Sequence, residues 1–452
     1  MRKKIRFYYW LVTSFLQKQF RLIVLSFTIS ILLIVAFISV SPTIDKVISS
    51  RRHIIGYIGQ FDYHNLPDEI VSKISSGLVF IDGKGNLIPA LAENWEASTD
   101  NKIFSFHLKK DISWSDGVAF TAKDLNYTFR DVVSKVVSPY LIQFEVKESL
   151  PIFPTYLTKP IVKWPVIGVA GLYRTNKTKL IGGYLKELEL IPNKVDMPIL
   201  IYKFYDNETQ LLNAYRSGEI REFTTTKKNI VEIFKIWRNT QIDRGIDYSL
   251  LLTLFFNTKV SFLKDKEVRQ AIAVAFDKNF LSDYGLIAES PIPPNSWAFN
   301  SDLKKQIFNR ELLEKITKKD DIATAEVKLK FVSFFEYSNI AEIINKDLNE
   351  AGLQTKLDLV SYSAEPEFDL MLAYLKIQPD PDQYFFWHSS QQGKGNITGY
   401  QNLKIDKQLE DGRRFIKTSQ RNQFYLSFQK TILDDPPAVF IYYPYVYTIR
   451  RK

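Results

Sequence analysis

The feature that most constrains the fold is a strand, helix and strand pattern within residues 327–360. Apolar and polar residues alternate from Val327 to Phe331, which predicts a half-buried strand. An apolar stripe at helical spacing follows and ends at Gly352; its members are Ile340, Ile343, Ile344 and Leu348. A second strand is predicted over 357–360. Because this order is that of a βαβ unit, the two strands are expected to pair in parallel within an α/β fold.

A second patterned stretch covers residues 91–131. Phe104, Phe106 and Leu108 alternate with polar residues and predict a strand, and Asp116-Gly117 marks a turn. Thr121 and Asp124 have the spacing of a helix-capping pair. The apolar residues behind this pair recur at helical intervals, namely Leu125, Phe129 and Val132. We therefore expect a helix to begin near Thr121.

The N-terminus predicts the compartment. Residues 22–40 carry no charged side chain and are long enough to cross a bilayer as a helix. Residues 1–21 hold basic side chains and no acid, so the positive-inside rule predicts a cytoplasmic arm and an external remainder. Residues 41–52 are interpreted as a stalk. A signal peptide that is later removed is the alternative to this single-pass anchor in the cell membrane.

Charge and residue usage exclude several classes of function. The arm supplies six basic residues toward the net charge of +10, so the external part is only mildly basic and nucleic-acid binding is not supported. The chain has no cysteine, which excludes disulfides and thiolate sites. None of the four histidines has metal-ligand spacing, and the common hydrolase and phosphate-binding motifs are absent. We therefore predict no catalytic residues, no metal site and no cofactor.

Several motifs with fixed spacing resemble those of the family 5 extracellular solute-binding proteins, the oligopeptide- and dipeptide-binding components of ABC importers. Within 91–131 these are Leu91-Ala92-Glu93, Trp95, Trp114, Asp116-Gly117 and Thr121-Ala122-Lys123-Asp124. Further along, Phe256-Asn257-Thr258 precedes a Val-Arg-Gln-Ala helix pattern at 268–271, as in the family. The resemblance covers nearly all of the chain from about Ile54 onward.

The resemblance implies a two-lobed, type II periplasmic-binding-protein-like α/β fold with a discontinuous first lobe, here preceded by one transmembrane helix. Lobe I is expected over 53–252 with a return segment at 430–452, and lobe II over 253–429. The implied function is binding of a peptide or similar small solute by closure of the cleft, followed by delivery to an ABC permease and its ATPase. A sensor or interaction protein that kept the fold without transport is the alternative.

The resemblance also indicates a ligand-binding segment at 378–402. The residues expected to contact ligand are Trp114, Asp380, Asp382, Trp387, Asn396, Gly399 and Tyr400. Carboxylates, bulky aromatic residues and a glycine-containing loop suit an adaptable polar pocket. The competing interpretation is that the polar residues cap turns and the aromatic residues belong to the core.

One position departs from the peptide binders of this family. Three residues before the Asp-Pro pair, those relatives carry an aspartate that holds the peptide's α-ammonium group, whereas this chain has Ile377. An apolar side chain cannot pair with a buried ammonium. Either another acid, such as Asp380 or Asp382, takes this role, or the ligand is not a peptide; other relatives bind sugars, nickel chelates and opines.

Overall fold

The computed structural model describes residues 52–194, 196–318, 328–362 and 366–452, together with residues 13, 18–21, 25–26, 28–32 and 34. The predicted arm (1–21), membrane segment (22–40) and stalk (41–52) therefore lie mostly outside the described residues. Within the described part, no helix combines the length and the apolar character needed to cross a membrane.

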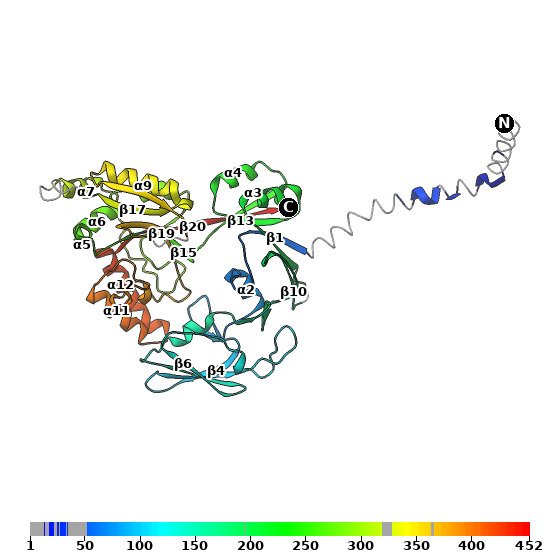
Figure 1. Ribbon diagram of the computed structural model, residues 1–452, viewed down its shortest axis with the longest axis horizontal. Coiled ribbons are helices and arrows are strands. Elements are labelled where there is room, and N and C mark those ends of the chain that lie inside the picture. The colour runs from blue at the N-terminus through cyan, green and yellow to red at the C-terminus, as the bar shows by residue number, and fades with distance from the viewer. Residues whose placement is uncertain are drawn as a thin grey trace.

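A twelve-stranded mixed sheet forms the centre of the molecule (Figure 1). Ten strands follow one path, in the order β10 (Tyr173–Ile181), β11 (Tyr184–Pro192), β12 (Ile199–Tyr205), β1 (Arg52–Ile58), β13 (Glu222–Thr225), β20 (Ala438–Arg451), β15 (Leu250–Phe256), β19 (Leu370–Lys376), β17 (Leu329–Phe334) and β18 (Thr355–Val360). Two further strands, β14 (Thr240–Ile246) and β16 (Gly285–Ile287), pair with β20 off this path.

The C-terminal strand β20 joins the two halves of this sheet. Its last residues pair with β13 and β14, for example Thr448 with Thr224 and with Asp243. Its first residues pair with β15 and β16, and Phe440 lies opposite Thr253. We call the strands from β10 to β14 the first half and those from β15 to β19 the second half; the predicted lobe boundaries remain predictions.

The predicted βαβ unit is confirmed. Strand β17, helix α9 (Ser338–Glu350) and strand β18 follow one another, and β17 and β18 pair in parallel, with Phe331 opposite Leu357. Three members of the predicted apolar stripe, Ile340, Ile344 and Leu348, are buried against these strands, whereas Ile343 is 40% exposed. Gly352 adopts φ +83°, which suits a glycine just after a helix end. Val327, the first residue of the predicted strand, lies outside the described residues.

Helices cover both faces of the second half of the sheet (Figure 1). On one face lie α5 (Ser261–Lys264), α6 (Lys266–Val274), α7 (Arg310–Thr317) and α9. On the other lie α10 (Tyr384–Trp387), α11 (Leu403–Arg413) and α12 (Thr418–Asp434). The first half carries α2 (Asp68–Ile74), α3 (Glu208–Ser217) and α4 (Lys228–Lys235). All five hydrophobic clusters of the described chain are built from residues 54 onward, so the segment 52–452 contains a complete core.

A smaller antiparallel sheet, which we call the small sheet, forms a separate unit at the bottom of Figure 1. Its strands, in spatial order, are β4 (Ala92–Ala97), β5 (Ile103–Leu108), β7 (Leu141–Val146) and β6 (Val132–Ser138). The predicted strand around Phe104 is therefore confirmed as β5. The short helix η2 (Phe153–Thr158) packs on this sheet through Phe153. Two-stranded ribbons β2–β3 (Val79–Ile81, Leu87–Pro89) and β8–β9 (Val162–Lys163, Ile167–Gly168) lie beside it.

The helix predicted to begin near Thr121 is wrong. The capping pair does form, because the Thr121 backbone N–H and hydroxyl both donate to the Asp124 carboxylate, at 2.7 and 3.0 Å. Only a single 3-10 turn follows, at Ala122–Asp124. The Tyr127 hydroxyl instead donates to the carbonyls of Leu157, in η2, and Lys159, just after it, and Val132 begins an edge strand. Tertiary packing and strand pairing thus override the local helical pattern.

Candidate functional site

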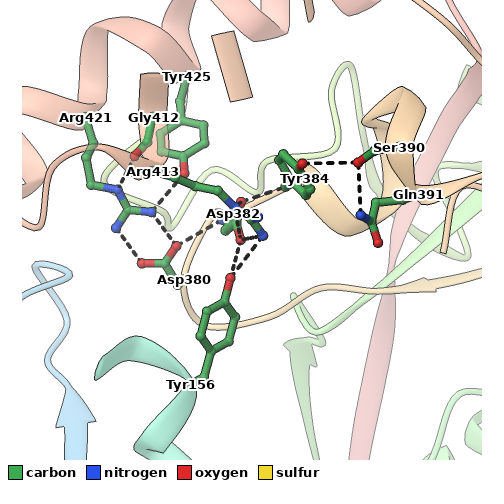
Figure 2. A network of polar contacts seen from close by, with 10 residues as sticks. All are labelled: Tyr156, Asp380, Asp382, Tyr384, Ser390, Gln391, Gly412, Arg413, Arg421 and Tyr425. Atoms are coloured by element: carbon green, nitrogen blue, oxygen red, sulfur yellow. Dashed lines mark hydrogen bonds and ion pairs between the residues drawn. The ribbon is translucent and has the colours of Figure 1, made fainter. Parts of the chain in front are cut away.

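The segment after β19 carries two carboxylates that are both neutralised by arginines from the C-terminal helices (Figure 2). Arg421 of α12 donates to both oxygens of Asp380 at 2.6 Å, in a two-pronged pair. The arginine side chain is 1% exposed, and its remaining donors reach the Gly412 carbonyl at 2.9 Å and the Tyr425 hydroxyl at 2.8 Å. Burial by itself lowers the pKa of Arg421, but the Asp380 charge outweighs burial and raises it. Asp380 is therefore fully engaged inside the protein.

The second carboxylate, Asp382, connects separate parts of the fold. Arg413 of α11 donates to its two oxygens through Nε at 3.0 Å and Nη2 at 2.6 Å. Tyr156 of η2, on the small sheet, donates its hydroxyl to Asp382 at 2.8 Å and accepts from Arg413 at 3.0 Å. The guanidinium of Arg413 also lies 3.7 Å from the ring centre of Tyr384. As Figure 2 shows, Tyr156 reaches this network from the opposite side to α11 and α12, so the network joins the small sheet to the second half.

Acid is expected to weaken this junction. Burial raises the pKa of Asp382, but Arg413 and Tyr156 outweigh burial and hold it below its ordinary value. A carboxyl whose pKa is depressed by folding stabilises the protein above its unfolded pKa of about 3.9, and this contribution is lost as pH falls through the folded pKa. We therefore expect the free energy of unfolding to fall below about pH 4, with Asp382 contributing up to ~1.4 kcal/mol per pH unit.

This pH dependence is measured by urea unfolding at a series of pH values. In Asp382→Asn the part of the slope that Asp382 contributes disappears, while Asp302→Asn, at an exposed loop position, controls for the change in net charge. An Asp382→Asn protein with the acid slope of the wild type would contradict the prediction.

The remaining residues predicted in this segment form the interior of its loop. Trp387 is 1% exposed, donates from Nε1 to Gln383 Oε1 at 3.1 Å, and packs against Phe255 and Phe440. Asn396 is buried and its amide donates to the Tyr400 carbonyl at 2.9 Å. The loop thus holds its own shape through side chains that face inward.

Two further positions close the same loop. Tyr400 is buried and donates its hydroxyl to the Asp435 carbonyl at 2.9 Å. Gly399 adopts φ +67°, and a Cβ there would lie 2.8 Å from Cε of Lys259. Ligand contact by any of the predicted residues in this segment stays a prediction, because the contacts described here are all internal.

Trp114 lies apart from that segment, in the core of the small sheet. It is 2% exposed, packs edge-on against Phe120 with 5.5 Å between ring centres, and lies under the ammonium of Lys163. The Asp116-Gly117 turn beside it forms as predicted, with the Gly117 N–H donating to the Trp114 carbonyl at 2.9 Å. Its role in ligand contact also stays a prediction.

A cavity of about 350 Å³ lies next to Tyr156. Aromatic side chains form much of its wall: Tyr63, Tyr127, Phe129, Tyr156 and Trp164. Its basic and acidic lining residues are His64 and Asp68, before and at the start of α2, and Lys159 and Lys163, which follow η2. Trp164 is 70% exposed and meets Tyr63 edge-on, with 6.0 Å between ring centres. A cavity of this size, with aromatic walls and several polar or charged groups, is typical of small-molecule sites.

Sequence reasoning did not identify this cavity. Residues 126–129 were predicted as helix, although they supply part of its wall as an irregular segment. The only signal for this cavity in the sequence was the density of aromatic residues within the segments that line it. Asp68 at the start of α2 pairs with Lys376 at the end of β19, at 3.0 Å, so the cavity also borders the second half of the sheet.

Ile377, the position where peptide-binding relatives carry an acid, is 6% exposed, and its N–H donates to the Ser249 carbonyl at 2.7 Å. It therefore belongs to the core of the second half.

In the described parts of the chain, no three His, Cys, Asp or Glu side chains gather closely enough to hold a metal ion.

Comparison with known proteins identifies the family. The profile described as "Bacterial extracellular solute-binding proteins, family 5 Middle" matches residues 86–165 and 192–396, more than half of the chain. The chain belongs to the family 5 bacterial extracellular solute-binding proteins. The family predicted from the sequence motifs is therefore confirmed, and proteins of this family bind solutes outside the cytoplasm.

Individual family 5 proteins resemble this chain over most of their length. The oligopeptide-binding protein AppA of Bacillus subtilis is 24% identical over 86% of both chains, and the dipeptide-binding protein of Escherichia coli is 22% identical over 82% of this chain and 83% of its own. The structure of NikZ from Campylobacter jejuni, solved with Ni(L-His), superposes with a TM-score of 0.71 at 23% identity, covering 89% of this chain and 94% of NikZ. AppA from Bacillus subtilis, solved with a nonapeptide, gives 0.69 at 21% identity, covering 89% and 94%. These likenesses show that this family 5 protein has the type II periplasmic-binding-protein fold.

Proposed function

We propose that this family 5 protein is a membrane-anchored receptor on the outer face of the cell membrane that captures a peptide or similar small solute and delivers it to an ABC permease and its ATPase. The observation that carries the proposal is the aromatic cavity beside Tyr156, in a chain whose relatives include peptide-binding and Ni(L-His)-binding proteins. Residues 22–40 serve as the anchor and 41–52 as the stalk. Chemical conversion of the solute is not part of this function.

Binding in this proposal proceeds by closure of two lobes, 53–252 with 430–452 and 253–429, around the solute. The Tyr156–Asp382 contact supports this, because it joins a cavity-lining residue to the loop 378–402. Trp114, Asp380, Asp382, Trp387, Asn396, Gly399 and Tyr400 remain the candidate residues of the site. We assign most of them to holding its walls in place, since their side chains are engaged internally.

The cavity also bears on the ligand's charge. Asp68 is the one carboxylate among the residues that line it. Its present partner, Lys376, forms an exposed ion pair of the kind that contributes little to stability. A ligand ammonium can therefore replace Lys376 at Asp68 at small cost, and this exposed pair would orient a peptide amine while contributing little to its affinity.

Native mass spectrometry of residues 52–452, purified without added ligand and then denatured, tests this function. A ladder of small peptides supports peptide capture, and a single non-peptide mass keeps the receptor function but changes the ligand class. An empty protein that shows no thermal shift with peptide mixtures or small solutes contradicts solute capture and favours a sensor or interaction protein.

A matched pair of variants tests the location of the site. Trp164→Ala is expected to weaken binding of the identified ligand about tenfold or more, because an aromatic wall is lost, while its exposed position leaves folding unaffected. Phe280→Ala removes an aromatic residue that is similarly exposed, 76%, but lies outside the cavity. Equal affinities of the two variants, measured by calorimetry, would contradict this location.

A further inference from the structure

Basic side chains gather at the edge of the first half where the described fold begins and ends. We call this set the basic edge; its members are Arg52, Arg216, Arg221, Lys235, Arg238, Arg450, Arg451 and Lys452. Residues 1–51 contain eight basic and one acidic side chains, so residues 52–452 have a formal net charge of only +3. With their carboxylate partners Glu222, Glu232 and Asp243, the eight basic residues give this edge a net charge of +5, which exceeds the +3 of the whole of 52–452.

Backbone contacts bring together the segments that carry five of these residues, Arg52, Arg221, Arg238, Arg451 and Lys452. The Arg451 N–H donates to the Arg221 carbonyl at 2.8 Å, and the Lys452 N–H donates to the Asn239 carbonyl at 2.9 Å, next to Arg238. The Arg221 N–H donates to the Ile54 carbonyl, two residues from Arg52. Figure 1 shows the C-terminus beside α3 and β13, with the start of β1 on the same side of the molecule.

The charge of this edge is only partly neutralised. Arg450 pairs with Glu222 and Asp243, and Lys235 pairs with Glu232. For the other six side chains, no described carboxylate lies within 4.0 Å. The nearby Glu219 pairs with Lys203, and the Arg451 guanidinium donates to the carbonyls of Tyr215 and Arg216 at the end of α3. Apart from the terminal carboxylate, the basic edge thus presents mainly unpaired cations.

An exposed apolar residue lies within the same edge. Ile236 follows the last residue of α4 and is 83% exposed, between Lys235 and the Trp237-Arg238 pair. Trp237 packs inward against Phe234, with 5.1 Å between ring centres, so Ile236 is the apolar side chain that is free to enter a lipid interface beside the basic residues.

We infer that the basic edge docks on anionic phospholipid headgroups, holding the receptor domain against the membrane that carries it. The inference uses the anchor at 22–40 from the proposed function. Only eleven residues separate that segment from Arg52, and a chain of this length spans at most about 40 Å. Because the stalk joins the domain at Arg52, the basic edge is the part of the domain held nearest to the bilayer.

Vesicle sedimentation with residues 52–452, which lack the anchor, tests the surface itself. Binding is expected to vesicles of phosphatidylcholine with 30% phosphatidylglycerol (about one anionic lipid in three) and not to pure phosphatidylcholine, and to weaken as salt is raised. The double variant Arg221→Glu, Arg238→Glu is expected to bind at least about tenfold more weakly, since each basic residue near the surface contributes roughly fivefold.

The matched control is Lys304→Glu, Lys305→Glu, two exposed lysines of the second half that change the net charge equally. We expect it to retain the wild-type affinity, and both variants to keep the wild-type melting temperature. Equal losses in the two variants, or no binding of the wild type to anionic vesicles at low salt, would overturn the inference and leave a protein partner for this edge. The assay contains no solute, so its outcome is separate from that of solute capture.

Discussion

Replacing Arg421 with alanine is expected to lower the free energy of unfolding by about 3–5 kcal/mol. The reason is that Asp380, 10% exposed at its side chain, loses both of its guanidinium hydrogen bonds and is left as a buried, unpaired carboxylate. Removing one member of a buried ion pair costs far more than the pair itself contributes. Urea unfolding followed by circular dichroism measures the change.

Two further variants separate this explanation from a general effect of losing an arginine. Arg414→Ala removes an exposed arginine seven positions earlier, whose pair with Asp411 is at the surface, and is expected to cost less than about 1 kcal/mol. The double variant Asp380→Leu, Arg421→Met removes both charges and should recover most of the stability lost in Arg421→Ala. A double variant as unstable as the single one would contradict the buried-charge explanation.

Trp387→Ala is expected to destabilise the protein by about 3–5 kcal/mol. The indole packs on the face of the neighbouring strands β15 and β20, against Phe255 and Phe440, so its removal leaves a cavity in the core. It also leaves the buried Gln383 amide oxygen without its indole donor. The free energy of unfolding from denaturant titration measures this loss.

The neighbouring aromatic residues of α10 supply the control. Phe385, two positions earlier in the same short helix, is 51% exposed, so Phe385→Ala is expected to have a much smaller effect. If Trp387→Ala left stability unchanged and abolished solute binding, the indole would be a ligand contact and its structural role would be wrong.

The sequence predicts those parts of the fold whose pattern is local and agrees with the tertiary structure. The βαβ unit around α9 is correct because most of its apolar stripe packs with residues of both strands in one cluster. The helix expected near Thr121 fails because the same residues gain more from tertiary contacts. Phe129 packs against Phe153, and Val132 pairs with Val146. An apolar spacing compatible with a helix could not reveal partners that lie farther along the chain.

The candidate site is less predictable for a related reason. Asp382 and Tyr156 are 226 residues apart, and Asp380 and Arg421 are 41 apart, so no spacing pattern in one sequence links them. Asp380 and Asp382 were selected as polar groups available to a ligand, whereas the structure supplies each with an arginine. Because both residues are aspartates, the sequence indicates that each needs a positively charged partner when buried. Only the fold identifies these partners as Arg421 and Arg413.

The position of β20 has a consequence for the biogenesis of this protein. Strand β20 follows all the other described strands in the chain and completes both halves of the central sheet, since its 14 residues pair with β13 and β14 at one end and with β15 and β16 at the other. While these residues are still inside the ribosome, the strands on both sides of them retain open edges, and such edges invite aggregation. The central sheet can therefore be completed only after residues 438–451 have emerged, and a protein truncated before Ala438 would lack the strand that joins its two halves.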